Sequence, residues 1–187
     1  PAKALATITS AFYDHPSRGL KLIGITGTNG KTTVATLLYQ LFESMGYPSG
    51  LLSTINIQVH RKSHKTTHTT PDVIRINQHL KKMVKAGCEY VFMEVSSHAL
   101  AQERTAGLWF TGGIFTNLSR DHLDFHPDFP AYRDAKKKFF DQLPETAFAL
   151  VNNDDRNGMI MLQNTAAKPY RYAISSGADF KAIVLEQ

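Results

Sequence analysis

The sequence predicts an α/β fold in which helices flank a mostly parallel, doubly wound sheet. Short apolar stretches typical of buried strands alternate along the chain with longer stretches whose apolar residues have helical spacing. Several apolar stretches lead directly into glycine-rich or acidic segments, and ligands of open α/β sheets bind beyond the carboxyl ends of the strands. The 187 residues are 42% hydrophobic, which suits one domain with a sizeable core.

The first predicted elements are a helix, a strand and a second helix. Residues 1–20 begin with the helical pattern "AKALATITSAFY" and end in the turn-rich connector "DHPSRG". The apolar run "LKLIGIT" at 20–26 predicts a strand. The stretch 31–46 has apolar residues at helical spacing and ends at a glycine, as helices often do.

The middle of the chain continues the alternation. Residues 50–59, "GLLSTINIQV", predict a second strand, and 71–87 predict a helix with proline at its start and glycine at its end. The apolar run "EYVFMEV" at 89–95 predicts a buried strand. Residues 97–107, "SHALAQERTAG", predict the helix that follows it.

The last third repeats the pattern. Residues 110–117 predict a strand, 131–143 a helix and 147–152 a further strand. The remaining predicted elements are a helix at 155–166 and strands at 170–175 and 180–187.

Composition limits the classes of function. The single cysteine, Cys88, forms no internal disulfide, which favours a reducing, cytoplasmic setting. The net charge of +5 suits an anionic ligand. The basic cluster "HRKSHKTTH" at 60–68 is either a nucleic-acid patch or a polar loop, and its lack of interleaved aromatics favours the loop. No apolar run of about 20 residues and no signal-peptide pattern is present, so no membrane partner is expected. The chain begins at Pro1, and we expect a piece of a longer protein.

The segment "ITGTNGKTT" at 25–33 has the context of a phosphate-binding loop, because it follows a strand and opens a helix. Its glycines let backbone N–H groups approach phosphate oxygens, Lys31 can reach the terminal phosphates, and Thr32 can hold Mg²⁺. Ile25 stands where the general pattern has its first glycine. The alternative is a glycine-rich turn without a ligand.

Other chemistry is expected where strands end. Glu94 ends a predicted strand at the place where a second acid meets Mg²⁺ in nucleotide-binding folds, and alternatively caps the next helix. His122 lies between two aspartates in "TNLSRDHLDFH", either as a ligand or as a hydrogen-bonded structural residue. Asn153 and Asp154 in "VNNDD" can face a base and ribose, or cap a helix.

Lys136 interrupts an apolar helical stripe. At about 100° per residue, Lys136 shares a face with Tyr132, Phe139, Phe140 and Leu143, whereas the next two lysines turn away. A buried ammonium is costly, and burial favours the neutral amine, which can take part in chemistry. We therefore predict an inward-pointing Lys136.

The segments "TGTNGKTT", "HTTPD", "MEVSSHALAQER", "TNLSRDHLDFH" and "AYRDAKKKFF", in this order, resemble the central domain of the Mur ligases over nearly the whole chain. The resemblance is strongest to the members that add a diamino acid to a muramoyl dipeptide. It implies a P-loop NTPase-like fold, with residues 1–20 as the tail of a preceding uridine-binding domain and 21–187 as the ATP-binding domain. An amino-acid-binding domain would follow.

The resemblance also implies a reaction. ATP would activate the terminal carboxylate of UDP-MurNAc-L-Ala-D-Glu as an acyl phosphate, and the amine of a diamino acid, with meso-diaminopimelate the commoner choice, would attack it during peptidoglycan synthesis. The expected setting is a cytoplasmic monomer without nucleic-acid or membrane partners. The chain alone is expected to bind ATP weakly and not to ligate.

Residue roles follow from the same resemblance. Catalysis would fall to Lys31, Glu94, His122 and Lys136. Thr32 and Glu94 would hold one Mg²⁺, while His122 and Lys136, modified by CO₂ to a carbamate, would hold a second. The substrate would contact Thr69, Thr70, Ser96 and Arg104. The implied nucleotide-binding residues are Gly27, Thr28, Asn29, Gly30, Lys31, Thr32, Thr33, Asn153 and Asp154.

Three other functions compete with this one. Another ligase of the superfamily, such as a folylpolyglutamate synthase, would share the loop, the acid and the lysine. A P-loop switch or motor NTPase would hydrolyse nucleotide without an amine acceptor and gives Lys136 no role. A nucleotide-binding or scaffolding module would tolerate loss of Lys136.

Overall fold

The computed structural model describes residues 1–65, 71–120, 125–183 and 185. Its strands run through the chain as short segments separated, for the most part, by helices. They are β1 (Lys21–Thr26), β2 (Ser49–Leu52), β3 (Asn56–Val59), β4 (Lys62–Lys65), β5 (Tyr90–Glu94), β6 (Gly112–Phe115), β7 (Phe148–Asn152), β8 (Lys168–Ala173) and β9 (Phe180–Lys181).

These strands form one sheet in the order β4-β3-β2-β5-β1-β6-β7-β8-β9. Every pairing from β2 to β9 is parallel, and β3 and β4 add an antiparallel edge. The register sets Ile25 beside Glu94 and Thr26 beside Phe115, so β1, β5 and β6 end along one edge. The predicted fold class is confirmed.

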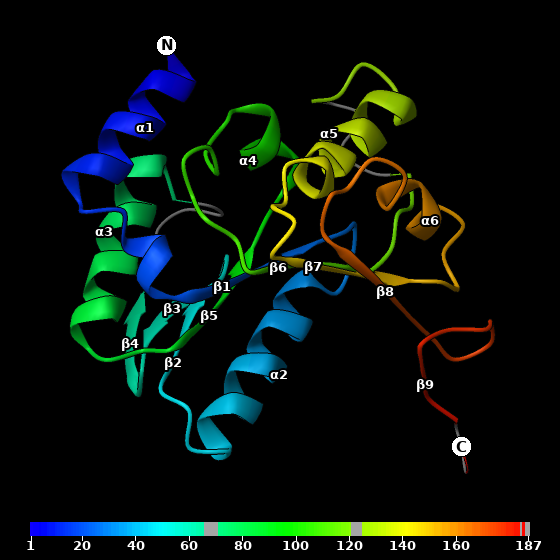
Figure 1. Ribbon diagram of the computed structural model, residues 1–187, viewed down its shortest axis with the longest axis horizontal. Coiled ribbons are helices and arrows are strands. Elements are labelled where there is room, and N and C mark those ends of the chain that lie inside the picture. Colours follow the sequence, from blue (N-terminus) through cyan, green and yellow to red (C-terminus); the bar gives the residue numbers. More distant parts are fainter. Residues whose placement is uncertain (66–70, 121–124, 184, 186–187) are drawn as a thin grey trace.

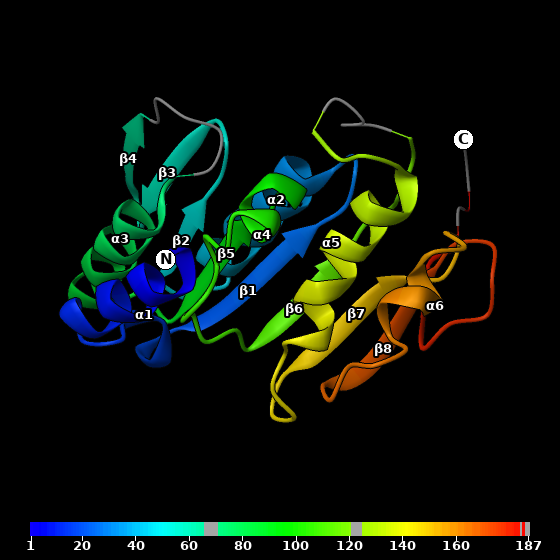
Figure 2. The ribbon, with the colours of Figure 1, turned by 90° about the horizontal axis from the view of Figure 1, so that it is seen from above.

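Helices lie on both faces of the sheet (Figure 1). In Figure 1, α2 extends below the sheet, α1, α4, α5 and α6 lie above it, and α3 lies at the left beside β2, β3 and β4; Figure 2 shows α3, α4 and α5 spread across the side opposite α2. Asp128 and Asp72 begin α5 and α3 by accepting a backbone N–H three residues on, as N-caps do. The helices are α1 (Ala2–Phe12), the 3₁₀ turn η1 (Pro16–Gly19), α2 (Lys31–Ser44), α3 (Val73–Lys85), α4 (Ser97–Ala101), α5 (Phe129–Asp141) and α6 (Gly158–Met161).

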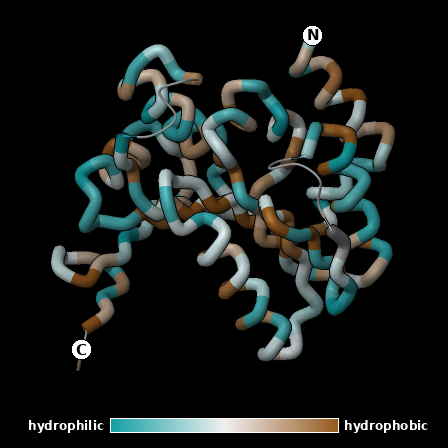
Figure 3. Tube along the Cα trace, turned by 180° about the vertical axis from the view of Figure 1, so that it is seen from behind, coloured by the Kyte–Doolittle hydropathy of each residue, from teal (hydrophilic) through white to brown (hydrophobic). Residues whose placement is uncertain are grey.

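The two faces carry two separate cores. The larger packs side chains such as Leu80 of α3 and Phe140 of α5 against the sheet, and the smaller packs Ala35 of α2 against Ile25 and Phe92. Figure 3 shows hydrophobic residues gathered along the central strands and hydrophilic residues in the outer turns. Burial on both faces explains why the central strands are continuous apolar runs rather than alternating ones.

The single strand predicted for 50–59 is wrong. The chain reverses after β2, and the segment becomes two antiparallel strands, β2 and β3. Ser53 makes the turn, because its hydroxyl accepts hydrogen bonds from the N–H groups of Ile55 and Asn56 and donates to the Asn56 carbonyl. Hydroxyl groups compete with the strand ladder in this way.

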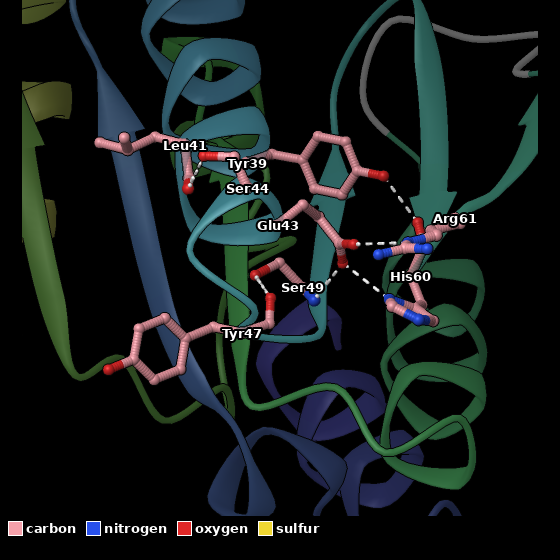
Figure 4. Close-up of polar contacts among 8 residues, drawn as sticks. All are labelled: Tyr39, Leu41, Glu43, Ser44, Tyr47, Ser49, His60 and Arg61. Atoms are coloured by element: carbon pink, nitrogen blue, oxygen red, sulfur yellow. Dashed lines mark hydrogen bonds and ion pairs between the residues drawn. The ribbon is translucent and has the colours of Figure 1, made fainter.

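The basic cluster at 60–68 is not wholly a loop, because β4 pairs with β3 along the sheet edge. Where this hairpin turns, His60 and Arg61 lie against Glu43 near the end of α2 (Figure 4). Charged residues on an edge strand also discourage pairing with another chain.

Three predicted elements are longer than the observed ones. The helix predicted for 97–107 ends after Ala101, because Glu103 is left-handed (φ 57°) and the Arg104 N–H bonds back to the Ala99 carbonyl. This arrangement terminates helices. The helix predicted for 155–166 is observed as the short α6, and it begins later than predicted because the Asp155 carboxylate holds a turn before it. The strand predicted for 180–187 is the two-residue β9.

No helix of the described residues is long and apolar enough to cross a bilayer. The leading helix α1 packs against α3, and the Ser10 hydroxyl donates to the Gly107 carbonyl. The assignment of residues 1–20 to a preceding domain stays a prediction.

Candidate functional site

The loop between β1 and α2 requires glycine at its first position. Gly27 has φ 151°, and a Cβ there would lie 2.0 Å from the Thr116 hydroxyl oxygen and 3.0 Å from the Asn117 carbonyl oxygen. Gly30, at the N-cap of α2, is also left-handed, with φ 83°. The loop therefore turns closely against the end of β6 and leads into the N-terminus of α2, the place where phosphate-binding loops offer backbone N–H groups.

Asn117 fixes the outer part of this loop. Its carbonyl accepts from the Thr28 N–H (2.8 Å), its side-chain oxygen accepts from the Asn29 N–H (3.0 Å), and its amide donates to the Asn29 carbonyl (3.1 Å). The sequence pattern of this segment indicated His122 and not Asn117 as a site residue. The available signal was an asparagine at the carboxyl end of a buried strand, where ligand-binding loops of such sheets lie.

Two lysines meet at one carbonyl of the loop. The Lys31 ammonium donates to the carbonyls of Gly27 (2.9 Å) and Thr28 (2.7 Å), and the Lys136 ammonium donates to the Gly27 carbonyl (2.8 Å). Lys136 is 1% exposed, so the predicted inward orientation is confirmed. The next two lysines instead pair with acids, Lys137 with Asp141 and Lys138 with Glu103.

Thr32 and Glu94 form an oxygen pair beside the loop. The Thr32 hydroxyl donates to one carboxylate oxygen of Glu94 (3.0 Å), and the other accepts from the Thr54 N–H (3.0 Å). Glu94 is buried at the end of β5. The side-chain cap of α4 is Ser96, so the alternative of Glu94 as that cap is not observed. Hydroxyl and carboxylate oxygens are ligands that suit Mg²⁺, so the pair fits such an ion.

Asn153 and Asp154 both face the segment after β8. The Asn153 amide donates to the Gly177 carbonyl (2.7 Å). The Asp154 carboxylate accepts from the N–H groups of residues 174–176, and these hydrogen bonds hold its pKa far below the usual range. Their predicted contact with a base and ribose stays a prediction.

Of the other predicted site residues, some lie in the part of the chain that the structure describes and some lie outside it. Thr33 is exposed in the first turn of α2. Ser96 caps α4 through the Ala99 N–H, and the Arg104 guanidinium donates to Gln102. Among the described residues no group of three or more His, Cys, Asp or Glu side chains is arranged to hold a metal ion. The remaining predicted residues, Thr69, Thr70 and His122, lie outside the described part of the chain.

The arrangement is suited to a polyphosphate. Two ammonium groups converge on a glycine-rich loop at the N-terminus of a 14-residue helix, where the helix dipole adds positive potential. An acid and a hydroxyl able to hold a divalent cation lie next to it.

Residues 25–187 match the family described as the Mur ligase middle domain. The chain belongs to this family. The resemblance seen in the motifs is therefore confirmed.

Named relatives agree with the family. A protein of Cytophaga hutchinsonii named UDP-N-acetylmuramoyl-L-alanyl-D-glutamate–2,6-diaminopimelate ligase is 57% identical over 180 residues, which make up 96% of this chain and 37% of the relative. A solved structure of a ligase with that name has a TM-score of 0.83 at 29% identity and covers 96% of this chain and 38% of its own.

A more distant solved structure shares the fold. A structure described as E. coli FolC in complex with DHPP and ADP has a TM-score of 0.64 at 17% identity, covering 92% of this chain and 48% of its own. The chain spans less than two fifths of the length of the diaminopimelate ligases it matches.

Proposed function

We propose that this chain is the ATP-binding domain of a ligase that joins 2,6-diaminopimelate to UDP-MurNAc-L-Ala-D-Glu in peptidoglycan synthesis. The observation that carries the proposal is the convergence of Lys31 and Lys136 on the Gly27 carbonyl, beside the Thr32–Glu94 pair. The names of the relatives support the substrates. The chemistry is the formation of an acyl phosphate on the D-Glu carboxylate, followed by attack of the diamino acid's amine.

Nucleotide would bind at the loop between β1 and α2. Lys31 exchanges its two carbonyl partners for phosphate oxygens, and the N–H groups at the start of α2 bind the same phosphates. Thr32 and Glu94 would hold Mg²⁺. The ion supplies charge neutralisation on the transferred phosphoryl group. Asn153 and Asp154 would lie near the adenosine.

Lys136 is suited to carry a carbamate formed with CO₂. Its amine lies in a buried position directly beside the loop, between the Gly27 carbonyl and the Tyr132 ring. A carbamate there would present oxygen ligands, and together with His122 it would hold a second Mg²⁺.

The muramoyl peptide would lie on the same edge of the sheet. Thr69, Thr70, Ser96 and Arg104 are the proposed contacts. Ser96 begins α4, two residues beyond Glu94 at the end of β5, which sets it at the carboxyl edge of the sheet. The proposed ligase is a cytoplasmic monomer without nucleic-acid or membrane partners.

Two other functions are less well supported. A folylpolyglutamate synthase would have the same fold, but the relatives with high identity carry the diaminopimelate ligase name. A P-loop switch NTPase would not need a buried lysine at the Gly27 carbonyl.

The test is ADP release by the full-length protein with ATP, Mg²⁺, the muramoyl dipeptide and one diamino acid at a time. We expect release with meso-diaminopimelate and little with lysine. The absence of ADP with every combination would refute the ligase proposal. The isolated 187-residue chain is expected to bind ATP weakly and to form no tripeptide.

A further inference from the structure

We propose that Tyr132 is a positioning residue that holds the phosphate loop in the form that binds nucleotide. The inference rests on the proposed function, because it assumes that the loop between β1 and α2 takes ATP. Tyr132 lies on α5, one turn before Lys136, and is fully buried. Nothing in the sequence pattern distinguished it from the apolar members of the same stripe.

The hydroxyl of Tyr132 reaches the loop through Thr28. The two hydroxyl oxygens lie 3.0 Å apart. Thr28 donates its own proton to the Ser119 carbonyl (3.3 Å) and accepts from the Ser119 N–H (3.0 Å). A threonine hydroxyl has one proton and two lone pairs. The Thr28 proton is used toward Ser119, so the Tyr132 hydroxyl is the donor to the remaining lone pair of the Thr28 oxygen. These hydrogen bonds join α5, the phosphate loop and the segment after β6.

The ring of Tyr132 contacts the second lysine of the site. The Lys136 ammonium lies 4.6 Å from the ring centroid while it donates to the Gly27 carbonyl. A cation over an aromatic face is attracted to it. Tyr132 therefore touches both sides of the loop, with its hydroxyl at Thr28 and its ring at the lysine that holds Gly27.

A core-filling role alone does not account for a tyrosine here. Phe139 and Phe140 fill the same helix face with apolar rings and are equally buried. A buried phenol requires a hydrogen-bond partner. One such partner here is Thr28, the loop residue that lies between Gly27 and the Asn117-bound Asn29.

Tyr132→Phe separates positioning from packing, because it keeps the ring and removes the hydroxyl. The matched control is Tyr39→Phe, which removes another hydrogen-bonded tyrosine hydroxyl (2.6 Å to the His60 carbonyl) at the β3–β4 hairpin. In the full-length protein, hydrogen exchange of residues 27–30 and 117–120 should be about fivefold faster in Tyr132→Phe, the loss of one net hydrogen bond. Tyr39→Phe should leave these residues unchanged.

The second readout is the affinity for Mg·ATP. Tyr132→Phe should weaken it by about fivefold, and Tyr39→Phe by less than about twofold, although both variants lower the unfolding temperature. Equal exchange and equal ATP affinity in the two variants would overturn the positioning role. If the wild-type protein binds no ATP, the proposed function fails. The exchange comparison still decides whether Tyr132 holds the loop.

Discussion

Each end of α2 places a charged side chain next to a turn, but the groups that surround the charge differ between the two ends. At the N-terminal end, Lys31 lies in the glycine-rich loop with Lys136. At the C-terminal end, Glu43 lies under the β3–β4 hairpin (Figure 4). Each side chain comes from the same helix and each is partly buried, yet we assign ligand binding to the first end and a structural role to the second.

The Glu43 end is closed by hydrogen bonds from the chain itself. One carboxylate oxygen accepts from the Ser49 N–H (2.7 Å) and lies 2.8 Å from the His60 ring nitrogen, and the other lies 3.6 Å from Arg61. Burial raises the pKa of Glu43, but the hydrogen bonds from His60 and Ser49 outweigh it and lower the pKa below 4.5. The acid fixes the hairpin to the helix.

The Lys31 end brings like charges together. Two ammonium groups meet at one carbonyl, where the helix dipole adds further positive potential. An arrangement of this kind gains most from an anion. Both charged side chains are partly buried, so burial does not distinguish the two ends. The partners do: a charge next to groups of opposite charge stabilises the fold, whereas two like charges side by side favour the binding of an anion.

The largest effect is expected from Lys136→Met. We expect the ligation rate of the full-length protein to fall by at least about a hundredfold, because a lysine carbamate could no longer support a metal. The free energy of unfolding of the chain should change by less than about 1 kcal/mol, because methionine matches the volume and removes a buried ammonium. Lys138→Met, two positions along the helix, is the control and should keep its rate. A normal ligation rate in Lys136→Met would show that Lys136 has only a structural role.

Gly27→Ala tests whether the loop shape is fixed by space. We expect the chain to lose about 4 kcal/mol of unfolding free energy from strain and overlap, since the new Cβ would lie 2.0 Å from the Thr116 hydroxyl. Gly30→Ala meets no atom within 4 Å and should lose only about 1 kcal/mol from its left-handed backbone. Chemical denaturation measures both. Equal losses would show that close packing at Gly27 is not the cause.

Lys31→Met should weaken ATP binding roughly 10- to 100-fold, the loss expected for a charge-assisted hydrogen bond. Titration calorimetry of the full-length protein measures this. Glu43→Gln, at the other end of the same helix, is the control and should leave the affinity within about twofold. A similar loss in both variants would mean that the two ends are not independent.

Glu43→Gln should instead destabilise the chain by about 2 kcal/mol, because a neutral amide replaces the charged carboxylate that accepts from Ser49 and His60. The effect depends on pH. The pKa of Glu43 is lower in the folded chain than its value of 4.5 when unperturbed, so its stabilisation is present above pH 4.5 and is lost as the pH falls through the lowered pKa. The wild-type and variant unfolding free energies should therefore converge below pH 4.5. A constant difference would exclude the carboxylate as the source.

Much of the site was readable because its signals are local. The order of glycine, lysine and threonine after an apolar run predicts the phosphate loop, and helical spacing alone turns Lys136 inward. The hairpin of β2 and β3 was missed, because its turn depends on the hydrogen bonds of the single Ser53 hydroxyl rather than on a glycine or proline. Tyr132 and Asn117 were missed as loop partners, because their partners lie 104 and 88 residues away.

The sequence by itself determined the alternation of strands and helices, the nature of the loop and the face of α5 on which Lys136 lies. These follow from spacing and from residue type, which act within a few positions of each other. The tertiary structure alone decided that Lys31 and Lys136 share the Gly27 carbonyl, that Glu94 meets Thr32, and that Tyr132 completes Thr28. These contacts depend on the order of β5, β1 and β6 in the sheet, which brings the ends of three distant strands to one edge.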